Sequence, residues 1–200
     1  TAYTDQVAFL DEVDRFAASH YGLPPRRAGA MDPQHRLMLD VTREALDDAG
    51  LGRGGFDRES TGVFFGLSAS DYRELLTASL RARGIAEGSS DPALAQAIKD
   101  RAVAQLAVAD SFALPGSLVN MAPAAVSRHF GLGGPSFAVD AACSSSLIAL
   151  EQAVLHLRQG TCTMAVVGGV YLSLTPDSLV GFSRPRRAVG QRGVPPVRRT

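Results

Sequence analysis

The stretch that decides the fold is PSFAVDAACSSSLIALEQAVLHLRQGTCTMAVVGGVYLSL, residues 135–174. Residues 135–142 are strand-like, because a short apolar run precedes Asp140 without any helical spacing. Residues 143–160 repeat apolar side chains at helical spacing up to Gly160, and residues 162–174 are typical of a second buried strand. Strand, helix and strand within about 40 residues predict a βαβ unit, so we expect a parallel sheet covered by helices.

Cys143 falls where the first of these strands meets the helix. In open parallel sheets, ligands and reactive groups lie at the carboxyl ends of the strands. A helix N-terminus also favours negative charge, including that of a thiolate. The three serines that follow are small enough to satisfy the free N–H groups of the first turn, and the two preceding alanines leave room for a substrate. Two interpretations stay open here: Cys143 is a nucleophile, or it is a small apolar side chain at a tight turn.

The rest of the chain adds helices and one more buried strand. We expect a helix that starts at Pro33 with Asp32 as its cap and stops at Gly50, a strand at 61–67, helical sequence over 71–109 with a break at 87–92, and a helix within 117–134 that is interrupted or bent at Pro123.

Composition predicts a globular chain of one domain or a large part of one, with 200 residues of which 46% are hydrophobic. No apolar run approaches the roughly 20 residues that span a bilayer, and the first residues lack the order of a signal peptide. We therefore expect a cytoplasmic protein without membrane contact, in which Cys143 and Cys162 are free thiols. Neither cysteine has the neighbours of a zinc site, so no metal is expected.

The charge of the chain is uneven, although its formal net charge is zero. Residues 186–200 hold five arginines and no acid, while the remainder holds 15 basic and 20 acidic residues, a net charge of −5. The body of the chain is thus not a nucleic-acid-binding surface, and the tail needs a separate explanation.

The other reactive residues have no context that favours catalysis. Cys162 precedes a strand and is interpreted as structural. His129 and His156 lie near predicted helix ends, where histidines cap carbonyl groups, while His20 and His35 lie beside turn or helix-start sequences. The VVGGV run lacks the spacing of a phosphate-binding loop and is better explained by close packing.

Five blocks follow one another along the chain: MDPQHRLMLDVTREALDDAGL, TGVFFGLSASDY, GPSFAVDAACSSSLIALEQAVLHLRQG, MAVVGGV and GFSR. In this order, and within a match over roughly residues 7–184, they resemble the β-ketoacyl synthase domain of type I polyketide synthases. The resemblance implies an α/β, thiolase-like fold, of which residues 1–185 are the N-terminal half of the complete α/β/α/β/α domain, so the fold is incomplete. It also implies a homodimer formed partly through the strand that leads into Cys143.

The resemblance further implies what Cys143 does. This residue would accept an acyl chain as a thioester from the phosphopantetheine arm of an acyl carrier protein, and no cofactor would be bound directly. The complete domain then condenses that chain with a decarboxylating malonyl-type extender on acyl carrier protein. Acyl and malonyl thioesters and the carrier protein are therefore the expected partners.

Two departures from the family pattern leave open whether this chain is an enzyme. The family's opening strand is missing, and so are its His-Gly-Thr-Gly-Thr and Asn-x-Gly-His motifs, whose donors stabilise the enolate. The alternative function is therefore a condensation-inactive remnant that at most acylates its own cysteine. An unrelated cysteine hydrolase is the third hypothesis, but Ala141 and Ser145 stand where its nucleophile elbow would need other residues.

The basic tail is interpreted as out-of-frame sequence. One GC-rich codon choice for Arg186–Arg199, read one nucleotide out of step, gives P-A-G-L-S-A-S-G-A-C-R-P-F-D, which resembles the family's continuation. The rival interpretation, a tail that binds nucleic acid, predicts salt-sensitive retention that is lost when residues 186–200 are deleted.

Overall fold

A computed structural model describes residues 10–102 and 111–183. Residues 13–172 belong to one compact unit, which contains the sheet and the helices α1 to α7. The second unit is described only for residues 10–12 and 173–183, of which 177–183 are helical. In that helix the Ser183 hydroxyl donates to the Leu179 carbonyl at 2.6 Å. The predicted helix end at 103–109 and the tail at 186–200 lie outside the described residues.

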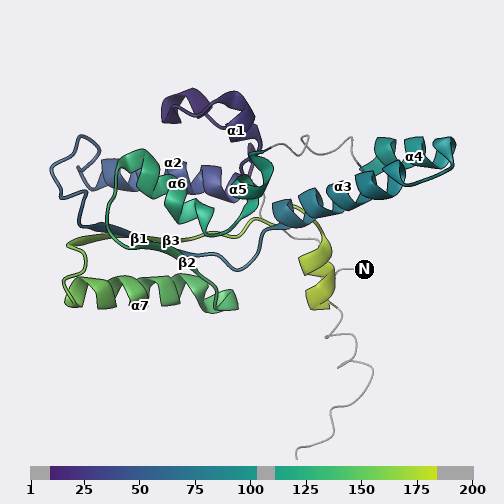
Figure 1. Cartoon of the computed structure of the whole chain (residues 1–200). Helices are drawn as coiled ribbons and strands as arrows, with labels where there is room; N and C mark the ends of the chain where they lie inside the picture. The colour runs from purple at the N-terminus through teal and green to yellow at the C-terminus, as the bar shows by residue number, and fades with distance from the viewer. Residues whose placement is uncertain (1–9, 103–110, 184–200) are drawn as a thin grey trace, which may run out of the picture. The chain divides into compact units, whose positions relative to one another are not determined.

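The centre of the larger unit is a parallel sheet of three strands in the order β2-β1-β3. The strands are β1 (Thr61–Gly66), β2 (Ser136–Val139) and β3 (Met164–Gly169). Helix α7 (Ser145–Arg158) connects β2 to β3 and crosses β1 on one face of the sheet (Figure 1). The predicted βαβ unit and parallel sheet are therefore confirmed, with β1 inserted between the two strands of the unit.

Two apolar layers enclose β1, because its side chains alternate between the faces of the sheet. Val63 and Phe65 pack with residues of α2 (Pro33–Asp48) and α6 (Met121–Phe130). Phe64 faces the other way and packs against α7. All six residues of β1 are buried, because helices cover both faces of the sheet at this strand, and its sequence accordingly contains no charged residue.

Helix α2 begins as the sequence predicts. The Asp32 carboxylate accepts the Gln34 N–H at 2.8 Å, and Pro33 occupies the first helical position. Asp32 is fully buried and also accepts the hydroxyl of Ser70, which itself caps the next helix by accepting Arg73 N–H at 3.0 Å. The two helix starts are thus linked through one buried carboxylate.

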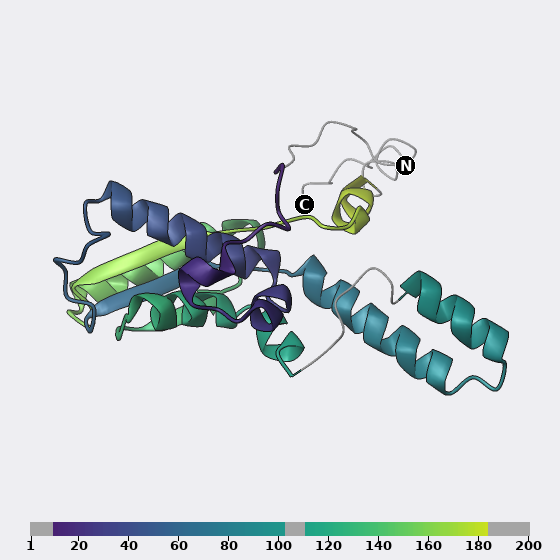
Figure 2. The ribbon, with the colours of Figure 1, turned by 90° about the horizontal axis from the view of Figure 1, so that it is seen from above.

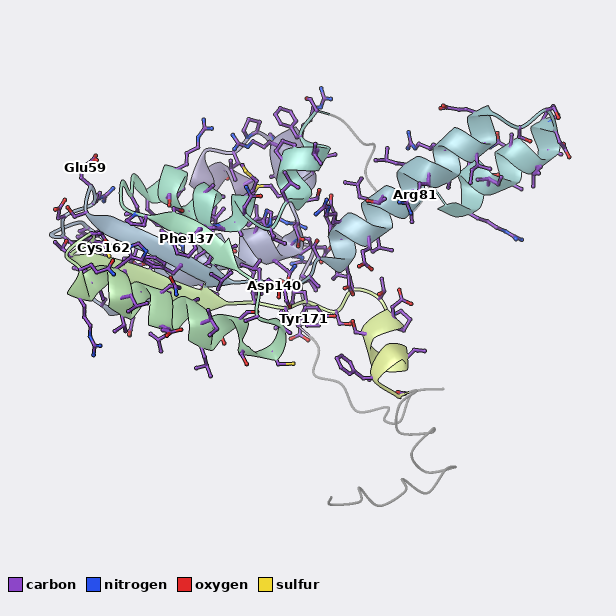
Figure 3. The ribbon with its side chains drawn as sticks, turned by 60° about the horizontal axis from the view of Figure 1, so that its bottom comes forward. Glu59, Arg81, Phe137, Asp140, Cys162 and Tyr171 are labelled. Atoms are coloured by element: carbon purple, nitrogen blue, oxygen red, sulfur yellow. The ribbon has the colours of Figure 1, made fainter. Side chains whose placement is uncertain are left out.

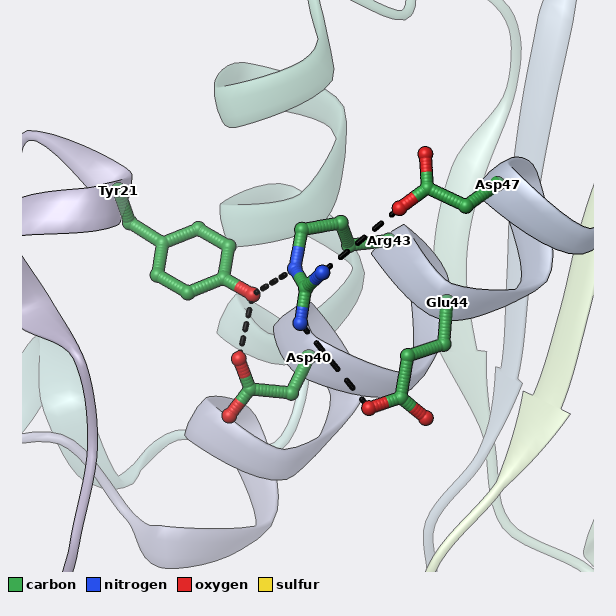
Figure 4. A network of polar contacts seen from close by, with 5 residues as sticks. All are labelled: Tyr21, Asp40, Arg43, Glu44 and Asp47. Carbon is green, nitrogen blue, oxygen red and sulfur yellow. Dashed lines mark hydrogen bonds and ion pairs between the residues drawn. The ribbon is translucent and has the colours of Figure 1, made fainter. Parts of the chain in front are cut away.

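A polar network joins the short helix η1, through Tyr21, to α2 (Figure 4). Two short helices, η1 (Ala18–Tyr21) and α1 (Pro25–Gly29), precede α2. The Tyr21 hydroxyl donates to Asp40 and accepts from Arg43 Nε at 3.3 Å, and Arg43 also pairs with Asp47 at 3.7 Å. Burial and the hydrogen bond to Asp40 raise the pKa of Tyr21 to about 12.

Helices α3 (Asp71–Glu87) and α4 (Pro92–Ala102) lie side by side and confirm the predicted break (Figures 1 and 2). The short α5 (Ala113–Ser117) follows, and α6 then starts at Met121. The expected bend at Pro123 is wrong, because Pro123 is the third residue of α6, where its missing N–H has no partner within the helix. The helix ends at Phe130 and is capped by Gly131, which has a left-handed φ of 66°.

The two outer strands differ from expectation in length and burial. Strand β2 ends at Val139, three residues earlier than the predicted range, and β3 is six residues long and only partly buried rather than fully buried. Both are outermost within the described sheet, so each has a strand partner on one side only.

Candidate active site: the turn between β2 and α7

Cys143 lies in a one-turn 3₁₀ helix, η2 (Ala142–Ser144), between the end of β2 and the start of α7. The predicted helix start at residue 143 is therefore replaced by this tighter turn, and the α-helix itself begins at Ser145. Cys143 is exposed. Figure 3 labels Asp140 at this end of the sheet and Cys162 at the opposite end. Cys143 thus lies beyond the carboxyl end of β2, as the sequence predicts.

The backbone of this turn takes an uncommon conformation. Ala142 has a φ of 50°, in the left-handed region that L-residues with a Cβ avoid. No other described residue except glycine has a positive φ. The sharp reversal directs the chain from the strand into the helix within a few residues and leaves Cys143 on the outside of the turn.

Side chains on both sides of the turn hold this conformation. The Ser145 hydroxyl accepts the Ala141 N–H at 2.9 Å and donates to the Ala142 carbonyl at 2.7 Å. Asp140 Oδ1 accepts the Ala142 N–H at 2.9 Å. These bonds account for both backbone polar groups of Ala142, so the strained residue is fixed from the strand end and from the helix start.

Glycines at the strand ends allow α7 to begin close to the sheet. A Cβ placed on Gly66 would lie 2.4 Å from the Ser145 carbonyl carbon and 2.5 Å from Ser146 N. A Cβ placed on Gly169, which pairs with Gly66 in the sheet, would lie 2.7 Å from Ser146 Cβ. Only residues without a Cβ permit this approach, so the two glycines set how deeply the first turn of α7 is seated.

Sequence reasoning identified Cys143 but missed Ser145, Gly66 and Gly169 as parts of the same arrangement. In sequence the three serines look equivalent, yet only Ser145 is buried, while Ser144 and Ser146 are exposed. The available signal for the glycines was their presence within two predicted strands, where close approach to another backbone is a usual reason for glycine.

None of the three histidines described next belongs to the turn η2. His156 is near the end of α7, about 16 Å along the helix from Ser145 at 1.5 Å per residue, where its Nδ1 contacts the Thr161 hydroxyl at 2.6 Å. His129 is at the end of α6, and partial burial lowers its pKa. His35 is buried in the first turn of α2, and its Nε2 contacts no hydrogen-bond partner among the described residues. Burial lowers the pKa of His35, opposed by the charge of Asp32.

Cys162 is buried at 2% exposure among Phe64, Ala149 and Ala153, which agrees with its predicted structural role. Within residues 10–102 and 111–183, no three His, Cys, Asp or Glu side chains gather as metal ligands. None of the helices in these ranges is both long enough and apolar enough to cross a bilayer.

Comparison with known proteins identifies the family. The Beta-ketoacyl synthase, N-terminal domain family matches residues 1–194, and the chain belongs to it. The chain is 41% identical over 178 residues to the spectinabilin polyketide synthase system protein NorC of Streptomyces orinoci, covering 89% of this chain and 7% of that protein. It is 38% identical over 186 residues to erythronolide synthase EryA2 of Saccharopolyspora erythraea, covering 93% and 4%.

Solved structures with the same fold are ketosynthase domains. The oxazolomycin ketosynthase domain OzmH KS7 of Streptomyces albus JA3453 superposes with a TM-score of 0.69 at 29% identity, covering 92% of this chain and 28% of that one. The ketosynthase from module 6 of the bacillaene synthase of Bacillus subtilis 168 gives 0.66 at 27% identity, covering 88% and 25%. The predicted α/β, thiolase-like fold is therefore confirmed as a partial domain, and the chain spans a small part of the relatives that it matches.

Proposed function

We propose that this chain is the part of a polyketide synthase ketosynthase domain that carries the acyl-accepting nucleophile, Cys143. The observation that carries the proposal is the exposed thiol on a strained turn at the strand-to-helix junction, in a chain of the β-ketoacyl synthase family. A thiolate at this place lies outside the sheet edge, where a thioester can approach it. It also lies just before the N-terminus of α7, where the helix dipole favours negative charge.

The acylation step is an exchange of thioesters. The Cys143 thiolate attacks the carbonyl carbon of an acyl group carried on a phosphopantetheine arm, and a tetrahedral oxyanion forms. Collapse of this intermediate breaks the bond to the phosphopantetheine sulfur, which leaves as a thiolate and takes a proton from solvent. The acyl group is then held as a thioester on Cys143, with no change in oxidation state.

Condensation is a property that we assign to the complete domain. There a malonyl-type extender on acyl carrier protein loses carbon dioxide, and the resulting carbanion attacks the acyl thioester and releases Cys143. The second candidate function is acylation of Cys143 without condensation. Homodimerisation and binding of an acyl carrier protein are part of the main proposal.

The test is to incubate the chain with an acyl thioester of N-acetylcysteamine and to follow its intact mass. We expect one acyl adduct, located on Cys143 by peptide mapping, absent from Cys143→Ala and retained by the matched control Cys162→Ala. Addition of malonyl-loaded carrier protein then separates the two candidates. Release of a β-ketoacyl product indicates condensation, and a stable adduct indicates self-acylation alone. A wild-type chain that gains no adduct on Cys143 contradicts the proposal.

A further inference from the structure

The serine triplet after Cys143 is not three equivalent residues. Ser145 is buried, at 6% exposure, and both its acceptor and its donor capacity are used inside the turn, on Ala141 N–H and the Ala142 carbonyl. Its flanking serines are exposed. A buried hydroxyl satisfied twice by the backbone of one turn is suited to fixing that turn rather than to contacting a substrate.

The residue that Ser145 holds is the strained one. Ala142 directly precedes Cys143, and its φ of 50° is disfavoured by contact of its Cβ with the following carbonyl. Such conformations persist only where the surroundings over-determine them. Here the surroundings are Ser145 from the helix and Asp140, whose Oδ1 holds the Ala142 N–H from the strand end.

Ser145 and Asp140 together form a clamp on Ala142, and the position of Ser145 is itself fixed by the sheet. Gly66 permits the backbone of Ser145 and Ser146 to lie directly on the end of β1, at distances that no Cβ would allow. Ser145 is thus held against the end of β1 by its backbone and hydrogen-bonded to Ala141 and Ala142 by its hydroxyl. The position of Cys143, the next residue, therefore depends on where α7 rests on the sheet.

We infer that Ser145, with Asp140, is a positioning residue for Cys143: it keeps Ala142 in the left-handed conformation that presents the thiol for acylation. This inference rests on the proposed function of Cys143. It assigns to Ser145 no contact with the acyl group. It predicts that the need for Ser145 disappears when residue 142 can adopt a positive φ without strain, which glycine can do.

The experiment measures the acylation rate of the full chain by an N-acetylcysteamine thioester in six variants, one of which is the double variant Asp140→Ala/Ala142→Gly. Losing two hydrogen bonds to the turn should lower the rate of Ser145→Ala about tenfold, and Asp140→Ala, which loses one bond at an exposed site, about threefold. Ser144→Ala and Ser146→Ala are the matched controls and should stay within about twofold of wild type. The double variant Ala142→Gly/Ser145→Ala should recover most of the lost rate.

Two further readouts separate failure of this inference from failure of the proposed function. The Ala141 amide, which donates to Ser145, should exchange its hydrogen about tenfold faster in Ser145→Ala. Protection of buried Cys162 from iodoacetamide reports whether each variant is folded. If Ser145→Ala exposes Cys162, the exposed-site variant Asp140→Ala and its rescue by Ala142→Gly decide the inference.

Equal acylation of wild type and Ser145→Ala, or a loss that Ala142→Gly does not repair, overturns the inference while the proposed function stands. If wild type itself accepts no acyl group, the proposed function fails and the role of Ser145 in acylation fails with it, and amide exchange then decides only whether Ser145 holds the turn. Faster exchange of Ala141 in Ser145→Ala supports the clamp, and unchanged exchange overturns it.

Discussion

Replacing Gly66 by alanine tests whether the start of α7 is seated directly on the sheet edge. The added Cβ would lie 2.4 Å from the Ser145 carbonyl carbon, whereas ordinary van der Waals contact begins at 3.4 Å. The first turn of α7 must therefore recede by about 1 Å, or β1 must bend, because the opposing atoms belong to the backbone and cannot rotate away.

The expected cost follows from that displacement. Overpacking of this kind lowers the free energy of unfolding by about 1–3 kcal/mol. A misplacement of about 1 Å at a reacting group can cost about 10²-fold in rate, so acylation of Cys143 should fall more than stability alone predicts. Urea denaturation followed by circular dichroism measures the first quantity, and intact mass against time measures the second.

The matched control is Gly84→Ala in α3. No atom lies within 4 Å of a Cβ placed on Gly84, so this variant should gain about 0.5–1 kcal/mol from the lower entropy of its unfolded chain. The same chemical change thus has opposite signs at the two positions. A Gly66→Ala chain as stable as wild type, with undiminished acylation of Cys143, would refute the seating of α7 described above.

Three further predictions concern buried groups. Asp32→Ala leaves buried donors without their acceptor and should lower the free energy of unfolding by about 3 kcal/mol, whereas exposed Asp48→Ala should stay within about 0.5 kcal/mol in the same urea titration. Burial lowers the pKa of His35 below its ordinary value of 6.5, so the unfolded chain binds this proton at a higher pH than the folded chain does. The free energy of unfolding should therefore fall as pH drops below 6.5. His35→Gln should reduce this dependence on pH, and an unchanged slope of the free energy of unfolding against pH would contradict the assignment. Iodoacetamide should label exposed Cys143 in the native chain and Cys162 only on unfolding, and equal native rates in peptide mapping would be inconsistent with the burial of Cys162.

Helix α2 and the position of the candidate nucleophile could be predicted because their signals are local. Asp32, Pro33 and Gly50 mark one helix through interactions among residues close together in the chain. Cys143 likewise marks a junction that its neighbours define. The error at Pro123 arose because a proline breaks a helix only beyond its first turn, and the first turn could not be located from apolar spacing alone.

The remaining features depend on residues far apart in the chain. Only the buried member of the serine triplet can hold the turn, and its burial depends on β1, about 80 residues earlier in the chain. The serines look alike in sequence because all have the same local propensity. Contact with the sheet distinguishes them.

The sequence by itself determined the order of the three strands and of the longer helices, the Asp32 cap of α2, the family and the place of Cys143, since each depends on short-range pattern or on ordered motifs. Only the tertiary structure decided that β1 lies between β2 and β3, and that Gly66 brings the start of α7 onto the sheet. Strand order and close backbone approach are set by pairing and packing between distant segments, which neither segment encodes alone.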